Sequence, residues 1–295
     1  MKSALRGAIT TLAYNVSPAH RRWRQLLDGL RIDEAALTGP IEHPSARDFM
    51  ICGSPRSGTT LLSAVLWQPP RVVTVSEPWD GLRMLPSELF ASIRREIAAT
   101  GELRRGRLDV EKLIETGEVV WGRDGDLVAP ADVDDDFLLG VKWPAFWRYV
   151  PLLPHTKFLV CIRDPVEVIT SYRTHGGDLV RGQDYDCSFN RVMNQHLRQA
   201  TGDLALRRVL LYDYINARLL PYLEHPNVYV VRYERWFEER DTMVAEIGEF
   251  LGASLGPGRP AIRTPRKGAG SDDAELSLIR ANCKTAPALG YPVGD

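Results

Sequence analysis

The chain has 295 residues with a formal net charge of −1, and 44% of its residues are hydrophobic and 25% charged. This length and composition suit one large globular domain, and we expect a single domain over residues 1–295. The balanced charge argues against electrostatic attraction to nucleic acid. No apolar run approaches the roughly 20 residues of a membrane helix.

The first 47 residues are predicted to be a helical N-terminal extension. Trp23, Leu26, Leu27 and Leu30 fall at helical spacing among basic residues. Such a helix can rest on a membrane or a partner, but its apolar stripe favours packing on the domain itself. Because the N-terminus lacks the apolar core of a signal peptide, we expect a cytoplasmic protein.

Residues 49–62, FMICGSPRSGTTLL, predict a buried strand, a loop of small residues and a helix that begins at Thr59. A loop of this kind directs backbone N–H groups and a helix N-terminus at a phosphate. The spacing from Gly53 to Gly58 resembles the phosphate loop of NTP-binding proteins, G-x4-G-K-[ST]. Here Thr59 stands in place of the lysine, and the cation is Arg56 inside the loop.

The following elements alternate between strands and helices. A strand at 71–76 ends at Glu77 and is followed by a predicted helical insertion at 80–136. Further strands are predicted at 138–142, 157–162 and 228–232, with the first at 49–53 and helix-like segments between them. This alternation predicts an α/β protein with a three-layer, P-loop-like fold, in which helices flank a central parallel sheet.

A second phosphate-binding pattern lies in residues 158–173, FLVCIRDPVEVITSYR. An apolar strand ends at Arg163, Asp164-Pro165 begins a helix, and Ser171 lies two turns into that helix. The planar guanidinium of Arg163 suits bidentate phosphate binding, and the Ser171 hydroxyl adds a donor.

Together these motifs resemble sulfotransferases that use 3′-phosphoadenosine 5′-phosphosulfate (PAPS) as donor. The loop of that family reads P-[KR]-S-G-T-[TS], and its second unit is R-D-P-x5-S. The resemblance implies that the 5′-phosphosulfate loop consists of Pro55, Arg56, Ser57, Gly58, Thr59 and Thr60. It also implies that Arg163 and Ser171 bind the 3′-phosphate and that the donor leaves as 3′-phosphoadenosine 5′-phosphate (PAP).

Two later motifs extend the resemblance. Tyr233, in the sequence VRYE, matches a strand-end tyrosine that reaches the adenine in the family. Arg266, Lys267 and Gly268 match a late R-K-G that returns to the 3′-phosphate. The family needs no metal, and no clustered ligand set in the sequence suggests one.

The catalytic base implied by the resemblance is Glu77, which follows the second strand as the glutamate of the tyrosylprotein branch does. The lysine of the heparan-type motif K-[ST]-P-A-[YF] corresponds to Lys142, although Trp143 replaces the hydroxyl residue. This pattern is nearest to the tyrosylprotein and carbohydrate branch. His155 and His175 are rival bases, as in the aryl sulfotransferases.

The resemblance implies a small-molecule acceptor with a hydroxyl group, a carbohydrate or a natural product, whose pocket the 80–136 insertion would shape. Arg56 would neutralise the leaving phosphate during in-line transfer to this acceptor. The alternative is a P-loop nucleotide kinase or NTPase, which the missing loop lysine disfavours. A homodimer is compatible with the sequence.

Overall fold

The computed structural model describes residues 37, 39, 41–104, 106, 128–172, 191–200, 203–257 and 273–291. They belong to two compact units. The sheet unit lies within Gly39–Arg163 and Arg218–Arg266, and the helical unit includes Asp164–Ala217 and Lys267–Asp295. Most of the N-terminal extension lies outside the described residues, and the expected single domain stays a prediction.

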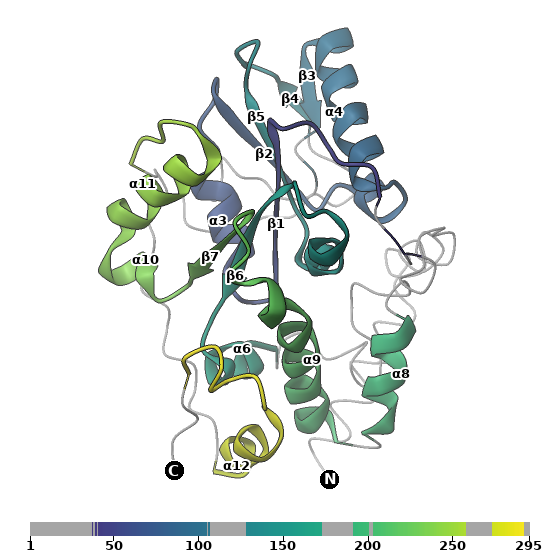
Figure 1. The fold of residues 1–295 in the computed structure, drawn as a ribbon, viewed down its shortest axis with the longest axis vertical. Helices are drawn as coiled ribbons and strands as arrows, with labels where there is room; N and C mark the ends of the chain where they lie inside the picture. Colours follow the sequence, from purple (N-terminus) through teal and green to yellow (C-terminus); the bar gives the residue numbers. More distant parts are fainter. Residues whose placement is uncertain are drawn as a thin grey trace. The chain divides into compact units, whose positions relative to one another are not determined.

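The sheet unit contains five parallel strands in the order β2-β5-β1-β6-β7, with β1 in the middle (Figure 1). Their bounds are β1 Asp48–Gly53, β2 Val72–Ser76, β5 Leu138–Lys142, β6 Lys157–Ile162 and β7 Val228–Arg232. These strands confirm the predicted α/β class and lie within one residue of the predicted bounds. They read as nearly unbroken apolar runs because both faces of a parallel sheet are covered.

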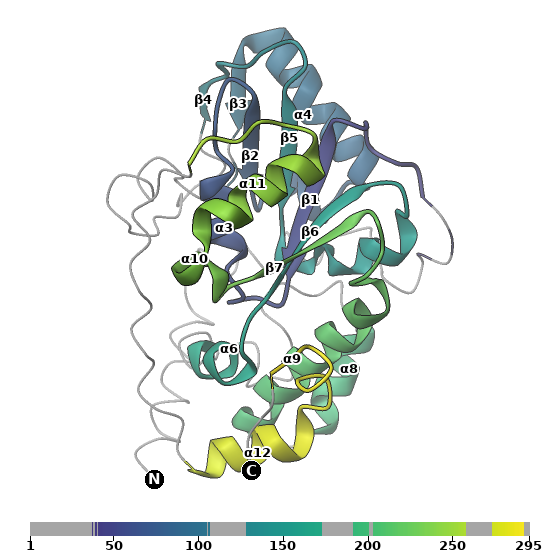
Figure 2. The same ribbon diagram turned by 60° about the vertical axis from the view of Figure 1, so that its left-hand side comes forward.

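Helices cover both faces of this sheet. On one face, α3 (Thr59–Val65), α10 (Arg235–Glu238) and α11 (Arg240–Leu251) pack on the alternate side chains Phe49 and Ile51 of β1 (Figure 2). The 3-10 helix η3 (Pro144–Leu152) contacts β1 as well. Met50 and Cys52, which point the other way along β1, are fully buried too. The sheet is therefore the middle layer of the unit.

The 80–136 segment is not made of helices alone. Within it, η2 (Trp79–Leu82) and α4 (Pro86–Thr100) precede a short antiparallel pair of β3 (Glu102–Arg104) and β4 (Val128–Pro130). The sequence predicted only helices here, because strands of three residues are too short to show an alternating pattern. Residues 105 and 107–127 lie outside the described part of the chain.

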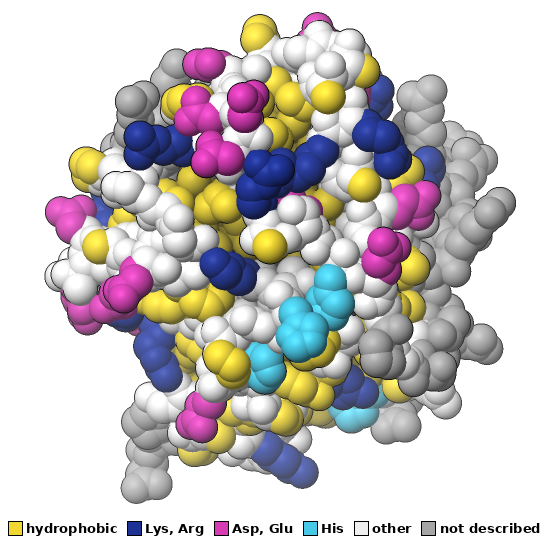
Figure 3. Space-filling view, turned by 45° about the horizontal axis from the view of Figure 1, so that its top comes forward, with side chains coloured by type: hydrophobic (Ala, Val, Ile, Leu, Met, Phe, Trp, Pro, Cys, Tyr) yellow, Lys and Arg dark blue, Asp and Glu magenta, His cyan; other side chains and the backbone are white. Residues whose placement is uncertain are grey.

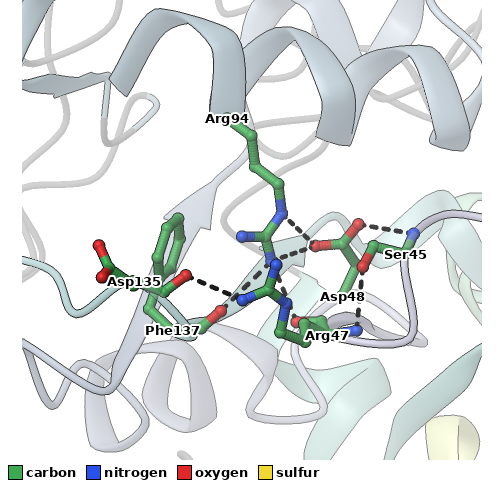
Figure 4. Close-up of polar contacts among 6 residues, drawn as sticks. All are labelled: Ser45, Arg47, Asp48, Arg94, Asp135 and Phe137. Atoms are coloured by element: carbon green, nitrogen blue, oxygen red, sulfur yellow. Dashed lines mark hydrogen bonds and ion pairs between the residues drawn. The ribbon is translucent and has the colours of Figure 1, made fainter. Parts of the chain in front are cut away.

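A polar network fixes the start of β1 against α4 (Figure 4). The Nε and Nη2 atoms of Arg94 donate to Asp48 Oδ1 at 2.9 and 2.6 Å, and the Ser45 N–H donates to Asp48 Oδ2. The Arg94 guanidinium also lies 4.4 Å from the centroid of the Phe137 ring. Burial raises the pKa of Asp48, although the hydrogen bonds and charge of Arg94 act in the opposite direction.

The helical unit contains α6 (Pro165–Ser171), α8 (Arg191–Gln199), α9 (Leu204–Leu219) and α12 (Asp273–Asn282). Asp164 caps α6 by accepting the Val166 N–H at 2.7 Å, as its place before Pro165 predicts. Helix α12 packs against α6, and Asp213 of α9 accepts the Thr285 N–H at 2.8 Å. Among the described helices of both units, none combines the length and apolarity of a membrane span.

Candidate active site

Five of the predicted site positions lie at the carboxyl ends of the five parallel strands. Arg56 is in the loop after β1, Glu77 follows β2, Lys142 ends β5, Arg163 follows β6 and Tyr233 follows β7. The chain runs from the central strand β1 out to β2 and later crosses to β6 on its other side. Ligands of open α/β sheets bind outside the carboxyl ends of the strands at such a reversal of strand order.

Glu77 and Lys142 form a buried ion pair. The Lys142 ammonium donates to Glu77 Oε1 at 2.5 Å, and the Glu77 N–H donates to the Lys142 carbonyl at 2.8 Å. Glu77 is 4% and Lys142 1% exposed. The parallel register that places Ser76 opposite Lys142 makes both contacts possible. Each charge compensates the other, as charges buried to this extent require.

Arg56 and Glu77 share an uncommon backbone conformation. Their φ angles are 71° and 53°, and they are the non-glycine residues with positive φ in the described part of the chain. The left-handed region costs a residue with a side chain about 1–3 kcal/mol, and such residues concentrate at active sites. Both residues were predicted to be catalytic from motif positions alone.

Arg163 and Tyr233 hold the loop after β1. Arg163 Nη1 donates to the Arg56 carbonyl at 3.2 Å, and the Arg163 guanidinium lies 4.1 Å from the centroid of the Tyr233 ring. The same ring packs on Gly58, where an added Cβ would lie 2.5 Å from Tyr233 Cδ2. Glycine at this position therefore lets the ring contact the loop where α3 begins.

The loop is also closed by its own contacts. The N–H and Oγ of Ser57 donate to the Ser54 carbonyl at 3.1 and 2.6 Å. Pro55 and Ser57 are buried, whereas Arg56 is exposed. Thr59 and Thr60 begin α3, as predicted. Arg56 is therefore exposed to solvent on a turn that the hydrogen bonds of Ser57 hold in place.

Three further predictions fall outside the sheet unit or outside the described residues. Ser171 is half-buried at the end of α6 in the helical unit. His175 and the Arg266-Lys267-Gly268 motif lie outside the described residues. No group of three or more His, Cys, Asp or Glu side chains that could hold a metal occurs within the described ranges.

His155 lies at the amino-terminal ends of the parallel strands, because it precedes β6. Its ring centroid is 5.1 Å from that of His43, which precedes β1, and His43 Nδ1 is 3.0 Å from Thr156 Oγ1. Figure 3 shows histidine side chains gathered on one face of the molecule. Burial and the neighbouring His155 lower the pKa of His43. His155 therefore lies at the opposite end of the strands from Glu77.

The sequence analysis missed a polar link between the loop helix and the strand before Glu77. Ser63 Oγ of α3 lies 2.8 Å from Ser76 Oγ, and Thr74 Oγ1 donates to the Ser63 carbonyl at 2.7 Å. Ser63, Thr74 and Ser76 are all fully buried. The available signal was three hydroxyl residues inside apolar runs, where each needs a hydrogen-bond partner.

Comparisons with known proteins place these features in context. The sequence model described as "Sulfotransferase family" matches residues 48–257. No match was found among curated proteins.

Among solved structures, a sulfotransferase domain from the curacin biosynthetic pathway is 16% identical, with a TM-score of 0.48 over 86% of this chain and all of that chain. A sulfotransferase from Alicyclobacillus acidocaldarius is 17% identical, with a TM-score of 0.37 over 82% of this chain and 96% of that one. A mouse sulfotransferase complexed with PAP is 12% identical, with a TM-score of 0.38 over 88% of this chain and 68% of that one.

Proposed function

The chain belongs to the sulfotransferase family, and from that premise we propose that it transfers a sulfuryl group from PAPS to a hydroxyl of a small-molecule acceptor. Carbohydrates and natural products are the acceptor classes to test first. The observation that carries the proposal is which residues share the carboxyl ends of the parallel strands. These ends hold the phosphate loop with Arg56, the Glu77–Lys142 pair and Arg163. The family assignment also disfavours the alternative of a nucleotide kinase.

The loop after β1 and Arg163 are proposed to hold the donor. The N–H groups of residues 58–60 and the exposed Arg56 face the 5′-phosphosulfate, and Arg163 takes the 3′-phosphate. The Ser57 N–H, predicted for the same role, donates to the Ser54 carbonyl instead and shapes the loop. Arg163 donates to the Arg56 carbonyl at 3.2 Å and therefore lies beside the loop. This supports the assignment of the two phosphates of one donor molecule to the loop and to Arg163. Ser171 and the Arg266-Lys267-Gly268 motif stay predictions for the same 3′-phosphate. The Tyr233 ring, which packs on Gly58, is the candidate contact for the adenine.

Glu77 is proposed as the general base of the transfer. The acceptor O–H gives its proton to the Glu77 carboxylate while the acceptor oxygen bonds to sulfur. The bond between sulfur and the 5′-phosphate oxygen breaks, and its electron pair leaves with PAP. Arg56 and the loop amides neutralise the charge that develops on the leaving oxygen. Lys142, hydrogen-bonded to Glu77, supplies a second cation beside the transferred group.

The proposal is tested by binding and by turnover. Isothermal titration measures the affinity for PAP, and transfer of ³⁵S from labelled PAPS is followed over carbohydrate, phenol and secondary-metabolite acceptors. We expect PAP to bind and transfer to persist in excess EDTA, because charged side chains provide the neutralisation. Absence of PAP binding would overturn the donor assignment. Abolition by EDTA, with rescue by magnesium, would instead indicate the chemistry of a phosphotransferase.

A further inference from the structure

Gly106, which belongs to the 80–136 insertion, docks on the end of strand β2. Its backbone forms a parallel bridge with Ser76, the last residue of β2. An added Cβ at Gly106 would lie 2.1 Å from the Ser76 carbonyl oxygen and 2.7 Å from its carbon. The φ angle of Gly106 is 77°. Both the close approach and the left-handed backbone therefore require glycine at this position.

The contact falls on the strand end that carries the proposed base. Ser76 is fully buried and precedes Glu77, and its hydroxyl lies 2.8 Å from that of Ser63 in α3. Strand β2 is an edge strand whose other side pairs with β5. Residue 106 is thus the outer backbone partner at this end of the sheet.

Glu77 needs such a partner, because its φ of 53° is strained for a residue with a side chain. Strained backbone persists only where the surrounding structure over-determines it. The Lys142 carbonyl constrains Glu77 from the sheet side, and the bridge to Gly106 constrains the preceding residue from the outside.

We propose that Gly106 is a positioning residue: its backbone contact with Ser76 fixes the turn that directs the Glu77 carboxylate at Lys142. The catalytic part of this inference rests on the proposed function, since it takes Glu77 as the base. The structural part concerns the geometry of the ion pair and stands on the contacts alone. A side chain at position 106 pushes residue 106 away from Ser76 and loosens the pair.

The test compares Gly106→Ala with Gly101→Ala as a matched control. Gly101 also has a positive φ of 67°, but an added Cβ there has nothing within 4 Å. Both variants strain the backbone, and only the first disturbs Ser76.

The first readout is chemical labelling of lysines with acetic anhydride, followed by mass spectrometry. Lys142 is 1% exposed, and the exposed Lys284 serves as an internal reference. In Gly106→Ala we expect labelling of Lys142 to increase by about tenfold or more through local opening. In Gly101→Ala it should match the wild type. Equal protection of Lys142 in all three proteins would overturn the proposal.

The second readout separates this inference from the proposed function. With 4-nitrophenol as probe acceptor, Gly106→Ala should lower kcat by roughly 10–100-fold, the effect of displacing a catalytic group by about 1 Å. Its affinity for PAP should stay within about twofold, since the loop at 54–58 is held by contacts of Ser54 and Arg163 that do not involve Ser76. If the wild type binds no PAP, the proposed function fails, while the labelling of Lys142 still decides the role of Gly106.

A measurement on the wild type covers the case in which Gly106→Ala does not fold. Because the Glu77 N–H points to β5, strand alternation turns the Ser76 N–H to the outer side of β2, the side on which Gly106 forms its bridge. Hydrogen exchange by NMR should find the Ser76 amide as protected as the centre of β2. Exchange at the rate of an open edge amide would overturn the proposal.

Discussion

Lys142 contacts Glu77 twice, once through its ammonium group at 2.5 Å and once through its carbonyl oxygen at 2.8 Å. The two residues are 65 positions apart in the sequence. They meet because β2 and β5 are neighbours whose last residues are in register. The side-chain contact pairs two buried charges, and the backbone contact fixes where the carboxylate can go.

Replacing Glu77 by glutamine should lower turnover by about 10²–10⁴-fold, the usual contribution of a general base. Glutamine keeps the shape and an oxygen to accept from Lys142 but cannot take the acceptor proton. The affinity for PAP should be unchanged. Transfer of ³⁵S to 4-nitrophenol and titration with PAP measure the two effects. The exposed Glu238→Gln is the control. Near-normal turnover in Glu77→Gln, with loss of turnover in His175→Ala, would make the histidine the base.

Replacing Lys142 by methionine should destabilise the protein by about 3–5 kcal/mol, because the Glu77 carboxylate is left buried without its cation. Adding Glu77→Gln to this variant should recover much of the loss, since no buried charge remains. Urea unfolding of the two single variants and the double variant gives the coupling energy. Lys284→Met, at an exposed position, is the control. Additive effects of the two substitutions would contradict the pairing.

Arg163→Ala should weaken PAP binding by about 2–5 kcal/mol if the phosphate buries the guanidinium. Arg163→Lys should recover only part of the affinity, because an ammonium group cannot form the bidentate contact. Arg71→Ala, at the exposed residue that precedes β2, should bind PAP as the wild type does. Titration calorimetry with PAP checks all three variants. Wild-type affinity in Arg163→Ala would refute the assignment of the 3′-phosphate.

Arg94→Ala should destabilise the fold by about 3 kcal/mol near neutral pH, because it removes the cation that compensates Asp48. The loss should shrink as the pH falls. The pKa of Asp48 is already raised by burial, so the folded state holds this proton more tightly than the unfolded state. The stability that this proton gives is complete below the unfolded pKa and is lost as the pH rises through the folded pKa. Removing Arg94 raises the folded pKa further.

Urea titrations from about pH 4 to 7 measure this dependence. Arg95→Ala, the exposed neighbour on α4, should show no such trend. A loss of stability in Arg94→Ala that is the same at every pH would mean that Asp48 does not carry the effect.

The sequence by itself determined the strands, the loop and the identity of most candidate residues. Each of the five parallel strands was predictable because burial on both faces requires an apolar run, which is a local signal. The loop at 55–60 and the R-D-P unit are contiguous motifs, so they too can be found without the fold. The Sulfotransferase family match over residues 48–257 confirmed the family that these motifs predicted.

Only the tertiary structure decided which of these residues meet. Strand order places β2 beside β5, and this order depends on how all the helices cover the sheet rather than on any local pattern. The left-handed backbone of Glu77 and the contact of Gly106 with Ser76 are likewise seen only in the folded chain. His155 lies at the amino-terminal end of the sheet because it precedes β6, whereas Glu77 lies at the carboxyl end because it follows β2. Sequence motifs specify which chemical groups are present. The distances between those groups depend on which strands pair, and that pairing is set by the packing of the whole sheet.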